Sequence, residues 1–252
     1  HILRSLSQWH ERWAFCGASA AVMHGLDCSY RQLHPIHVAV GRNSRPRNQR
    51  YVRFHVLDDA ETVAVDGARV TSILRTLVDC AAMMPRRYAM APIDSALRQG
   101  KTTVEQMLEY VDAIPMLRDR ERIRAVLAQG DGRVENGGES ECRAVLDELG
   151  FPVHRVQVEF PCLSHPGRVH RVDFLWERDD GTLIAGEFDG VQKYVDPLMT
   201  AGRIIRQVVD DERDRQQCLS RRGVDMVRMF YRDLDNAQVL AYRLEQARVP
   251  RR

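Results

Sequence analysis

Apolar and polar residues alternate along two stretches in the first half of the chain, which is the pattern of strands with one buried face. The stretches are residues 35–40 and 51–57. A third segment, residues 62–70, contains Asp66-Gly67 at its centre, and this dipeptide fits the tight turn of a hairpin. The pattern therefore predicts a small sheet in this region.

Helical spacing of apolar residues replaces the alternation after the hairpin. The first helical segment carries apolar residues three or four positions apart: Ile73, Leu74, Leu77, Val78 and Ala81. Thr102 or Thr103 can cap a later helix, because a threonine hydroxyl accepts a hydrogen bond from the first free N–H groups. A charged amphipathic helix is predicted over residues 117–129. With a small-residue helix that ends at Gly25, these segments predict an α+β domain over residues 1–131.

A boundary between two domains is predicted near residue 131. Residues 130–138 hold four Gly in nine positions and show no apolar period. Such Gly-rich segments are typical of linkers. A second domain is therefore expected over residues 139–252.

The second domain has a different order of elements. Its apolar patterns predict a helix, three strands, a helix, a strand and a closing helix, which is an α/β arrangement with an αβββαβ core. The predicted segments are residues 139–149, 156–160, 169–176, 183–189, 208–222, 224–230 and 236–247.

Three carboxylates, Asp173, Glu187 and Asp189, interrupt an otherwise apolar hairpin in this domain. Residues 179–181 suit a three-residue loop closed by glycine, and that loop places Asp173 directly opposite Glu187. Opposed like charges repel across strands, and half-buried carboxylates are costly, so a cation between the two acids is expected. Ligand sets made of oxygen favour Mg²⁺ or Mn²⁺. The alternative is a hairpin whose acids are solvated on an open face.

Composition describes an ordinary globular protein of 252 residues, with 44% hydrophobic and 29% charged residues. The net charge of +2 is too small to indicate a nucleic-acid partner by itself, so any basic surface must be local. The longest apolar runs are far shorter than a bilayer span, and no signal-like start is present. The six scattered cysteines predict a reducing, cytoplasmic setting, and the start at His1 predicts that earlier residues are missing.

Weaker candidate sites lie elsewhere. Five arginines occur in a loop that enters a predicted strand, where they either contact phosphates or remain solvated: Arg42, Arg45, Arg47, Arg50 and Arg53. Arg171, beside the acidic hairpin, is a further candidate for contact with nucleic acid. Cys162, His165 and His170 offer zinc ligands, but their spacing is irregular and a fourth ligand is not evident.

Three motifs characterise the first domain: Ala18-Ser-Ala-Ala-Val-Met-His-Gly-Leu26, Asp66-Gly-Ala-Arg-Val-Thr71 and Arg75-Thr-Leu-Val-Asp79. Together they resemble the AbiEi-type antitoxins of abortive-infection systems. Those antitoxins usually begin with a winged helix, most or all of which is expected to be missing or truncated here. The resemblance implies a regulator whose partner is DNA or a cognate toxin.

Motifs of the second domain include Glu139-Ser140, Arg171-Val-Asp-Phe-Leu-Trp176 and Gly186-Glu-Phe-Asp-Gly-Val-Gln-Lys-Tyr194. With the αβββαβ order, they resemble the PD-(D/E)XK nuclease fold. More narrowly, they are similar to an uncharacterised bacterial domain related to very short patch repair endonucleases. The resemblance extends from residue 139 to about residue 235 and implies a restriction-endonuclease-like fold.

This second resemblance implies a set of catalytic residues. In such nucleases the Asp and the Glu of the hairpin bind a metal ion, which assigns Asp173 and Glu187 as metal ligands and Glu139 as an additional acid. Asp189 holds the position of the usual catalytic Lys, and Lys193 just beyond it is the candidate to replace that group. Bound Mg²⁺ or Mn²⁺ would polarise a phosphate and activate a water, while Lys193 would stabilise the developing charge.

Three hypotheses follow for the function. The first is a metal-dependent DNA endonuclease linked to a toxin–antitoxin or phage-defence system, and the carboxylate trio favours it. The second is a non-catalytic, antitoxin-like regulator that binds DNA or a toxin, which the missing Lys and the antitoxin-like half favour. The third is a nuclease-like module that serves only assembly. All three place the protein in the cytoplasm, away from membranes.

Overall fold

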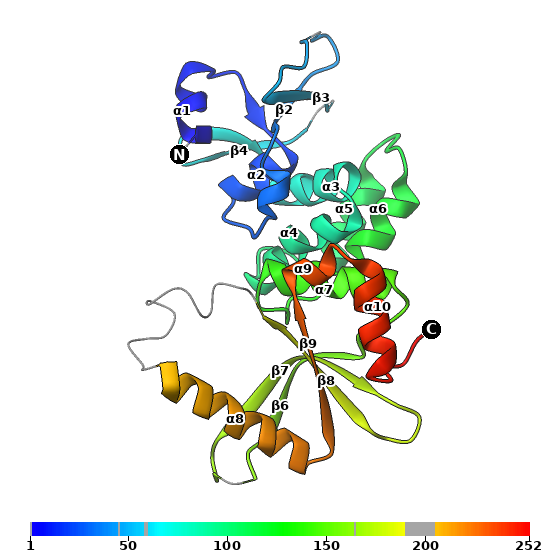
Figure 1. The fold of residues 1–252 in the computed structure, drawn as a ribbon. Coiled ribbons are helices and arrows are strands. Elements are labelled where there is room, and N and C mark those ends of the chain that lie inside the picture. Colours follow the sequence, from blue (N-terminus) through cyan, green and yellow to red (C-terminus); the bar gives the residue numbers. More distant parts are fainter. Residues whose placement is uncertain (1, 45, 58–59, 164, 190–204) are drawn as a thin grey trace. The chain divides into compact units, whose positions relative to one another are not determined.

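The computed structural model describes residues 2–44, 46–57, 60–163, 165–189 and 205–252, with only the backbone given for 205–212 (Figure 1). The chain splits into two compact units, His1–Glu141 and Cys142–Arg252. Each unit combines a mixed sheet with helices. Within the described part of the chain, every helix is too short or too polar to cross a membrane.

The sheet of the first unit has the strand order β3-β2-β1-β5-β4. Its strands are β1 (Ala14–Phe15), β2 (Ile36–Val40), β3 (Val52–Val56), β4 (Thr62–Val65) and β5 (Ala68–Thr71). The turn between β4 and β5 has Asp66 and Gly67 at φ of 49° and 78°, as the predicted tight hairpin requires. The two-residue β1 was not predicted, because it is too short to show alternation. It nevertheless joins the sheet, pairing antiparallel with β2 and parallel with β5.

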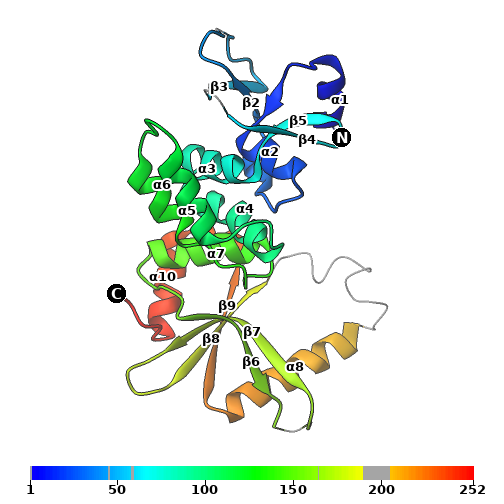
Figure 2. The ribbon, with the colours of Figure 1, turned by 180° about the vertical axis from the view of Figure 1, so that it is seen from behind.

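Helices make up most of the rest of the first unit. They are α1 (Ile2–Trp9), α2 (Gly17–Met23), α3 (Ile73–Met83), α4 (Arg86–Arg98), α5 (Val104–Ala113) and α6 (Arg120–Leu127), with a 3-10 turn at Tyr30–Gln32. Helices α1 and α2 lie against the sheet, and the others pack on α2 and on one another. Helix α2 packs on the strands through Ala20, which joins Phe15 and Val38 in a buried cluster (Figure 2). Thr103 forms a capping box with Gln106 at the start of α5, so the predicted threonine cap is confirmed.

A buried ion pair joins two turns of α3. Arg75 Nε lies 2.8 Å from Asp79 Oδ1, and both side chains are almost fully buried. Burial raises the pKa of Asp79 to about 6, although the Arg75 guanidinium opposes the rise. Both residues belong to a motif that carries the antitoxin resemblance, so this motif forms part of the core of the first unit.

The predicted linker over residues 130–138 is packed against α4 instead of being free. A Cβ added to Gly130 would lie 2.6 Å from Leu97 Cδ1. The N–H of Asp131 donates to the Asp94 carboxylate at 2.8 Å. These glycines therefore allow the backbone to approach the helix closely. Composition alone cannot distinguish glycines that permit close packing from glycines that make a linker flexible.

The sheet of the second unit has the strand order β6-β7-β8-β9. Its strands are β6 (Arg155–Pro161), β7 (Val169–Glu177), β8 (Leu183–Asp189) and β9 (Val224–Phe230), and the helices around them are α7 (Gly137–Glu148), α8 (Ile205–Arg221), α9 (Tyr231–Leu234) and α10 (Ala237–Gln246). Strands β6, β7 and β8 pair antiparallel, whereas β9 lies parallel to β8. The order of elements from α7 to β9 is the predicted αβββαβ order.

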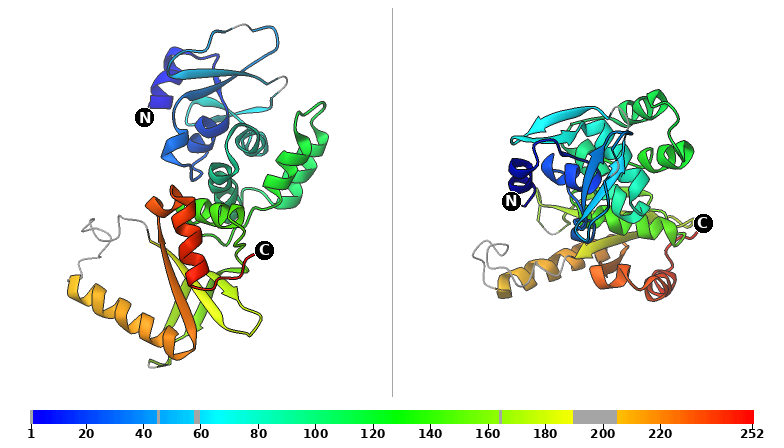
Figure 3. Two further views of the ribbon diagram at one scale, coloured as in Figure 1. Left: turned by 45° about the vertical axis from the view of Figure 1, so that its right-hand side comes forward. Right: turned by 90° about the horizontal axis from the view of Figure 1, so that it is seen from above.

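Helix α8 lies along the sheet of the second unit (Figure 3). Leu219 of α8 packs with Val172, Ala185 and Val224 in a buried cluster. Trp176 of β7 is fully buried, and its Nε1 donates to a backbone carbonyl at 3.3 Å. The sheet is thus covered closely enough for β7 and β8 to hold their side chains in fixed positions.

We expect Gly186→Ala to destabilise the second unit, because the new Cβ would lie 2.7 Å from Trp176 Cζ3 and 3.1 Å from Met229 Cε. Overpacking of this kind costs about 1–3 kcal/mol of unfolding free energy. Urea unfolding followed by tryptophan fluorescence measures the loss. Gly41→Ala is the matched control, since a Cβ there meets nothing within 4 Å. Equal losses in the two variants would contradict the packing argument.

Candidate functional site

The acidic hairpin of the second unit has the predicted register. Strands β7 and β8 pair Phe174 with Gly186, and the loop between them is closed by Gly181 at a φ of 80°. Continued by one residue, this register brings Asp173 opposite Glu187. A three-residue loop was therefore enough to fix which acids face each other.

Each of the three acids has a partner within the unit. The Asp173 carboxylate accepts a hydrogen bond from the backbone N–H of Phe188 at 2.8 Å. Glu187, which is 5% exposed, forms an ion pair with Arg215 of α8. Asp189 lies 4.0 Å from the guanidinium of Arg228 on the neighbouring strand β9.

These partners change the electrostatic argument for a metal. A cation was expected between the acids because opposed carboxylates repel and are costly to bury. Two guanidinium groups, from Arg215 and Arg228, supply positive charge at two of the three acids. Side chains of the chain itself therefore supply counter-charges for Glu187 and Asp189, and neither arginine was singled out for this role in the sequence.

Glu139 has a local structural role at the start of α7. Its carboxylate accepts hydrogen bonds from the backbone N–H of Glu135 at 3.0 Å and from the side-chain amide of Asn136. Asn136 in turn accepts from the N–H of Glu139 at 3.1 Å, which is the geometry of a helix N-cap. Glu139 belongs to the first unit and the hairpin acids to the second.

Lys193, the candidate catalytic lysine, lies outside the described residues. Among the residues that are described, Asp173, Glu187 and Asp189 are not a group of ligand atoms close enough for one ion, whereas Cys162, His170 and Cys218 are. The assignment of the three acids and Lys193 to catalysis stays a prediction.

The predicted arginine loop joins β2 and β3 in the first unit. Residues 41–57 contain five arginines and no acidic residue. Those described are all exposed and are called the basic loop below: Arg42, Arg47, Arg50 and Arg53. Arg45 lies outside the described residues. The Arg50 guanidinium stacks over the exposed ring of Tyr51, 5.1 Å from its centroid.

A pocket of about 650 Å³ opens beside the basic loop. Its wall includes Gly41, Ser44 and Pro46 of the loop and two more exposed arginines, Arg12 and Arg69. Trp13 and Phe54 line it as well, with their rings 5.6 Å apart in an edge-to-face arrangement. The first unit thus presents cations and aromatic rings around one concave surface.

Arg171, also predicted to contact nucleic acid, is exposed on β7 of the second unit. Its backbone carbonyl accepts a hydrogen bond from Arg215 at 2.5 Å. The structure therefore places Arg171 near the acidic hairpin, while the basic loop belongs to the first unit.

Residues 13–129 match the family model described as the AbiEi antitoxin C-terminal domain. The first unit is antitoxin-like. The match covers the basic loop, the adjacent pocket apart from Arg12, and the buried Arg75–Asp79 pair, and it ends before the acidic hairpin begins. It supports the predicted resemblance of the first domain and is silent on the second.

Two relatives from Mycobacterium tuberculosis extend the comparison. They are the uncharacterized proteins MT2308 of strain CDC 1551 / Oshkosh and Rv2248 of strain ATCC 25618 / H37Rv. Each is 29% identical to this chain over 186 residues, which cover 72% of the chain. The match spans 64% of the length of these relatives.

We expect Arg215→Ala to destabilise the second unit strongly, because it leaves the buried Glu187 without this counter-charge. Breaking a buried ion pair from one side costs about 3–5 kcal/mol. Chemical unfolding at pH 7 measures the loss, and the double variant with Glu187→Gln should recover part of it. Arg155→Ala is the control, since Arg155 and Glu177 form an exposed pair at 3.7 Å that is worth at most about 1 kcal/mol. Similar losses in both single variants would refute the proposed role of Arg215.

Proposed function

We propose that this chain is a non-catalytic, antitoxin-type regulator that binds DNA through the basic loop and pocket of its first unit. The proposal places it in a toxin–antitoxin or phage-defence system. The observation that carries it is the position of the basic loop, which lies inside the region that matches an antitoxin domain.

The chemistry of the basic loop fits a nucleic-acid ligand. Arginine guanidinium groups bind phosphate oxygens in bidentate geometry, and a run without acids does not repel the backbone of DNA. The aromatic pair Trp13 and Phe54 adds surfaces on which an exposed base can stack. A net charge of only +2 is compatible with this role, because the positive charge is concentrated locally.

The second unit supports the non-catalytic part of the proposal. Its αβββαβ order and the parallel pairing of β8 with β9 resemble the PD-(D/E)XK arrangement, but a fold by itself does not establish activity. Arg215 and Arg228 supply positive charge beside Glu187 and Asp189, a role that a bound divalent ion would otherwise fill. We infer that this unit serves binding or assembly.

A second candidate is a Mg²⁺- or Mn²⁺-dependent DNA endonuclease. The register that sets Asp173 opposite Glu187 favours it, since paired carboxylates on adjacent strands suit a hard divalent ion. In this alternative Arg215 would leave Glu187 when metal binds, and Lys193 would stabilise the developing charge. A cognate toxin is a possible partner in either case.

We expect duplex DNA binding by the full chain to weaken steeply with salt, and the triple variant Arg42→Ser, Arg47→Ser, Arg50→Ser to bind more weakly. The slope of log K against log salt is negative, and each lost phosphate contact reduces its magnitude by about 0.9. The slope of the triple variant should therefore be smaller in magnitude by about 2 to 3. Fluorescence anisotropy over a range of salt concentrations measures the slope. As control, Arg118, Arg155 and Arg222, which are exposed elsewhere, are changed to Ser together. An equal loss of slope in that control would mean that binding is not localised to the loop.

We expect wild-type protein to show no Mn²⁺ binding that depends on Asp173 and no cleavage of plasmid, linear duplex or single-stranded DNA. Calorimetry with Mn²⁺ and an agarose-gel assay measure the two properties, with Asp173→Ala purified in parallel as the control for contaminating nucleases. Cleavage by wild type that disappears in Asp173→Ala would replace the regulator by the endonuclease. Binding of DNA without cleavage, in contrast, supports the regulator.

A further inference from the structure

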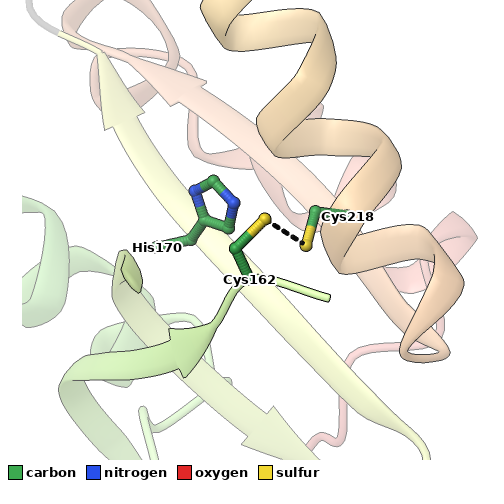
Figure 4. Close-up of side chains that lie close together, drawn as sticks. All are labelled: Cys162, His170 and Cys218. Atoms are coloured by element: carbon green, nitrogen blue, oxygen red, sulfur yellow. Dashed lines mark hydrogen bonds between the residues drawn. The ribbon is translucent and has the colours of Figure 1, made fainter. Parts of the chain in front are cut away.

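One group of metal-ligating side chains in the described part of the chain comes from three separate elements of the second unit. Cys162 follows β6, His170 lies near the start of β7, and Cys218 lies in the last turns of α8 (Figure 4). One ligand atom from each lies within 4.8 Å of the others. The Sγ atoms of Cys162 and Cys218 are 3.3 Å apart.

A candidate for a further ligand, His165, lies next to Cys162 but outside this group of three. His165, in the loop between β6 and β7, places Nδ1 3.8 Å from the Cys162 Sγ. Cys162, His165 and His170 line a small pocket of about 160 Å³. Cys162, His165 and His170 were weak zinc candidates in the sequence because a further ligand was not evident. Cys218 on α8, which the sequence did not single out, joins Cys162 and His170 in the group.

His170 provides independent evidence that a ligand is expected. The residue is 4% exposed, and its Nε2 atom is buried with no hydrogen-bond partner. A buried polar atom without a partner costs roughly 1–3 kcal/mol, so its presence calls for an explanation. A metal ion bound to this nitrogen would remove that cost.

We propose that Cys162, His165, His170 and Cys218 bind a structural zinc ion. Zn–S bonds of ~2.3 Å and Zn–N bonds of ~2.0–2.1 Å in a tetrahedron put two sulfurs ~3.8 Å apart and a sulfur and a nitrogen ~3.5 Å apart. The Cys162–Cys218 and Cys162–His165 separations of 3.3 Å and 3.8 Å differ from these by about half an ångström or less. His165 lies outside the group of three, so its side chain would have to move closer to the other ligands to complete the tetrahedron. A complete set of four protein ligands is typical of structural zinc and leaves no open position for substrate.

The surroundings favour zinc over a disulfide between the two cysteines. Their sulfurs lie well beyond the ~2.05 Å of a disulfide, and such a bond would leave His170 without a partner. The N–H of Leu163 donates to the Cys218 Sγ at 3.1 Å, a contact that stabilises a thiolate ligand. Two sulfurs and two imidazoles also suit tetrahedral zinc better than magnesium or manganese.

The zinc site would fix the position of α8 on the sheet. The site would join the loop between β6 and β7 to Cys218 of α8. The next residue, Leu219, packs in the buried cluster with Val172. Arg215, which pairs with Glu187, lies three residues before Cys218 and so on the same side of the helix. The proposed ion would therefore help to hold Arg215 on the acidic hairpin, whether or not the chain binds DNA.

We expect the full chain, purified without a histidine tag, to contain one zinc per chain by elemental analysis. Cys162→Ser, His170→Asn and Cys218→Ser should each reduce this to below about a tenth, because structural sites depend on every ligand. His154→Gln and Cys28→Ser are matched controls from outside the group and should keep the metal. Replacement by Co²⁺ should give the visible absorption of a tetrahedral site with two thiolates.

Wild-type protein can be tested even if a variant does not fold. Chelator should lower the melting temperature of wild type, and added zinc should restore it. Protein that is purified without zinc and does not take it up under reducing conditions would overturn the proposal.

Discussion

The buried ion pair between Glu187 of β8 and Arg215 of α8 is the interaction on which the chemistry of the second unit depends. Glu187 is almost fully buried, so its charge requires a partner. A buried ion pair is not by itself a large source of stability, because both groups lose their hydration. Removing only one partner is, however, costly, because it leaves the other charge buried without compensation. The position of α8 is therefore coupled to the charge on Glu187.

Three contacts hold α8 in the place where that coupling works. Leu219 packs in the cluster with Val172, Arg215 reaches Glu187, and Cys218 lies beside Cys162. Residues 215, 218 and 219 follow helical spacing, so they face the sheet together. In this arrangement α8 places the Arg215 guanidinium beside the Glu187 carboxylate.

The first unit carries the surface best suited to nucleic acid. Its sheet is assembled around the short central strand β1, and this arrangement makes β2 and β3 parallel neighbours joined by the basic loop. The loop, the adjacent aromatic pocket and the antitoxin match all concern the same part of the chain. The proposed regulator function therefore rests on this unit. In the second unit, Arg215 and Arg228 supply positive charge beside Glu187 and Asp189, which argues against the proposed catalytic site.

Local chemistry in the sequence determined several features. The loop over residues 179–181 fixed the register of the acidic hairpin, Asp66-Gly67 fixed a tight turn, and a threonine capped α5, since each depends only on neighbouring residues. Apolar periodicity likewise gave the order of elements in the second unit.

Other features depend on residues far apart in the chain, and only the tertiary structure decided them. Gly130 looked like part of a linker because its contact with Leu97 is long-range. The pairing of Arg215 with Glu187 and of Cys218 with Cys162 joins residues 28 and 56 positions apart. Periodicity and local composition do not reveal contacts between residues so far apart in the chain. The partners of Glu187 and Cys162 were therefore set by packing alone.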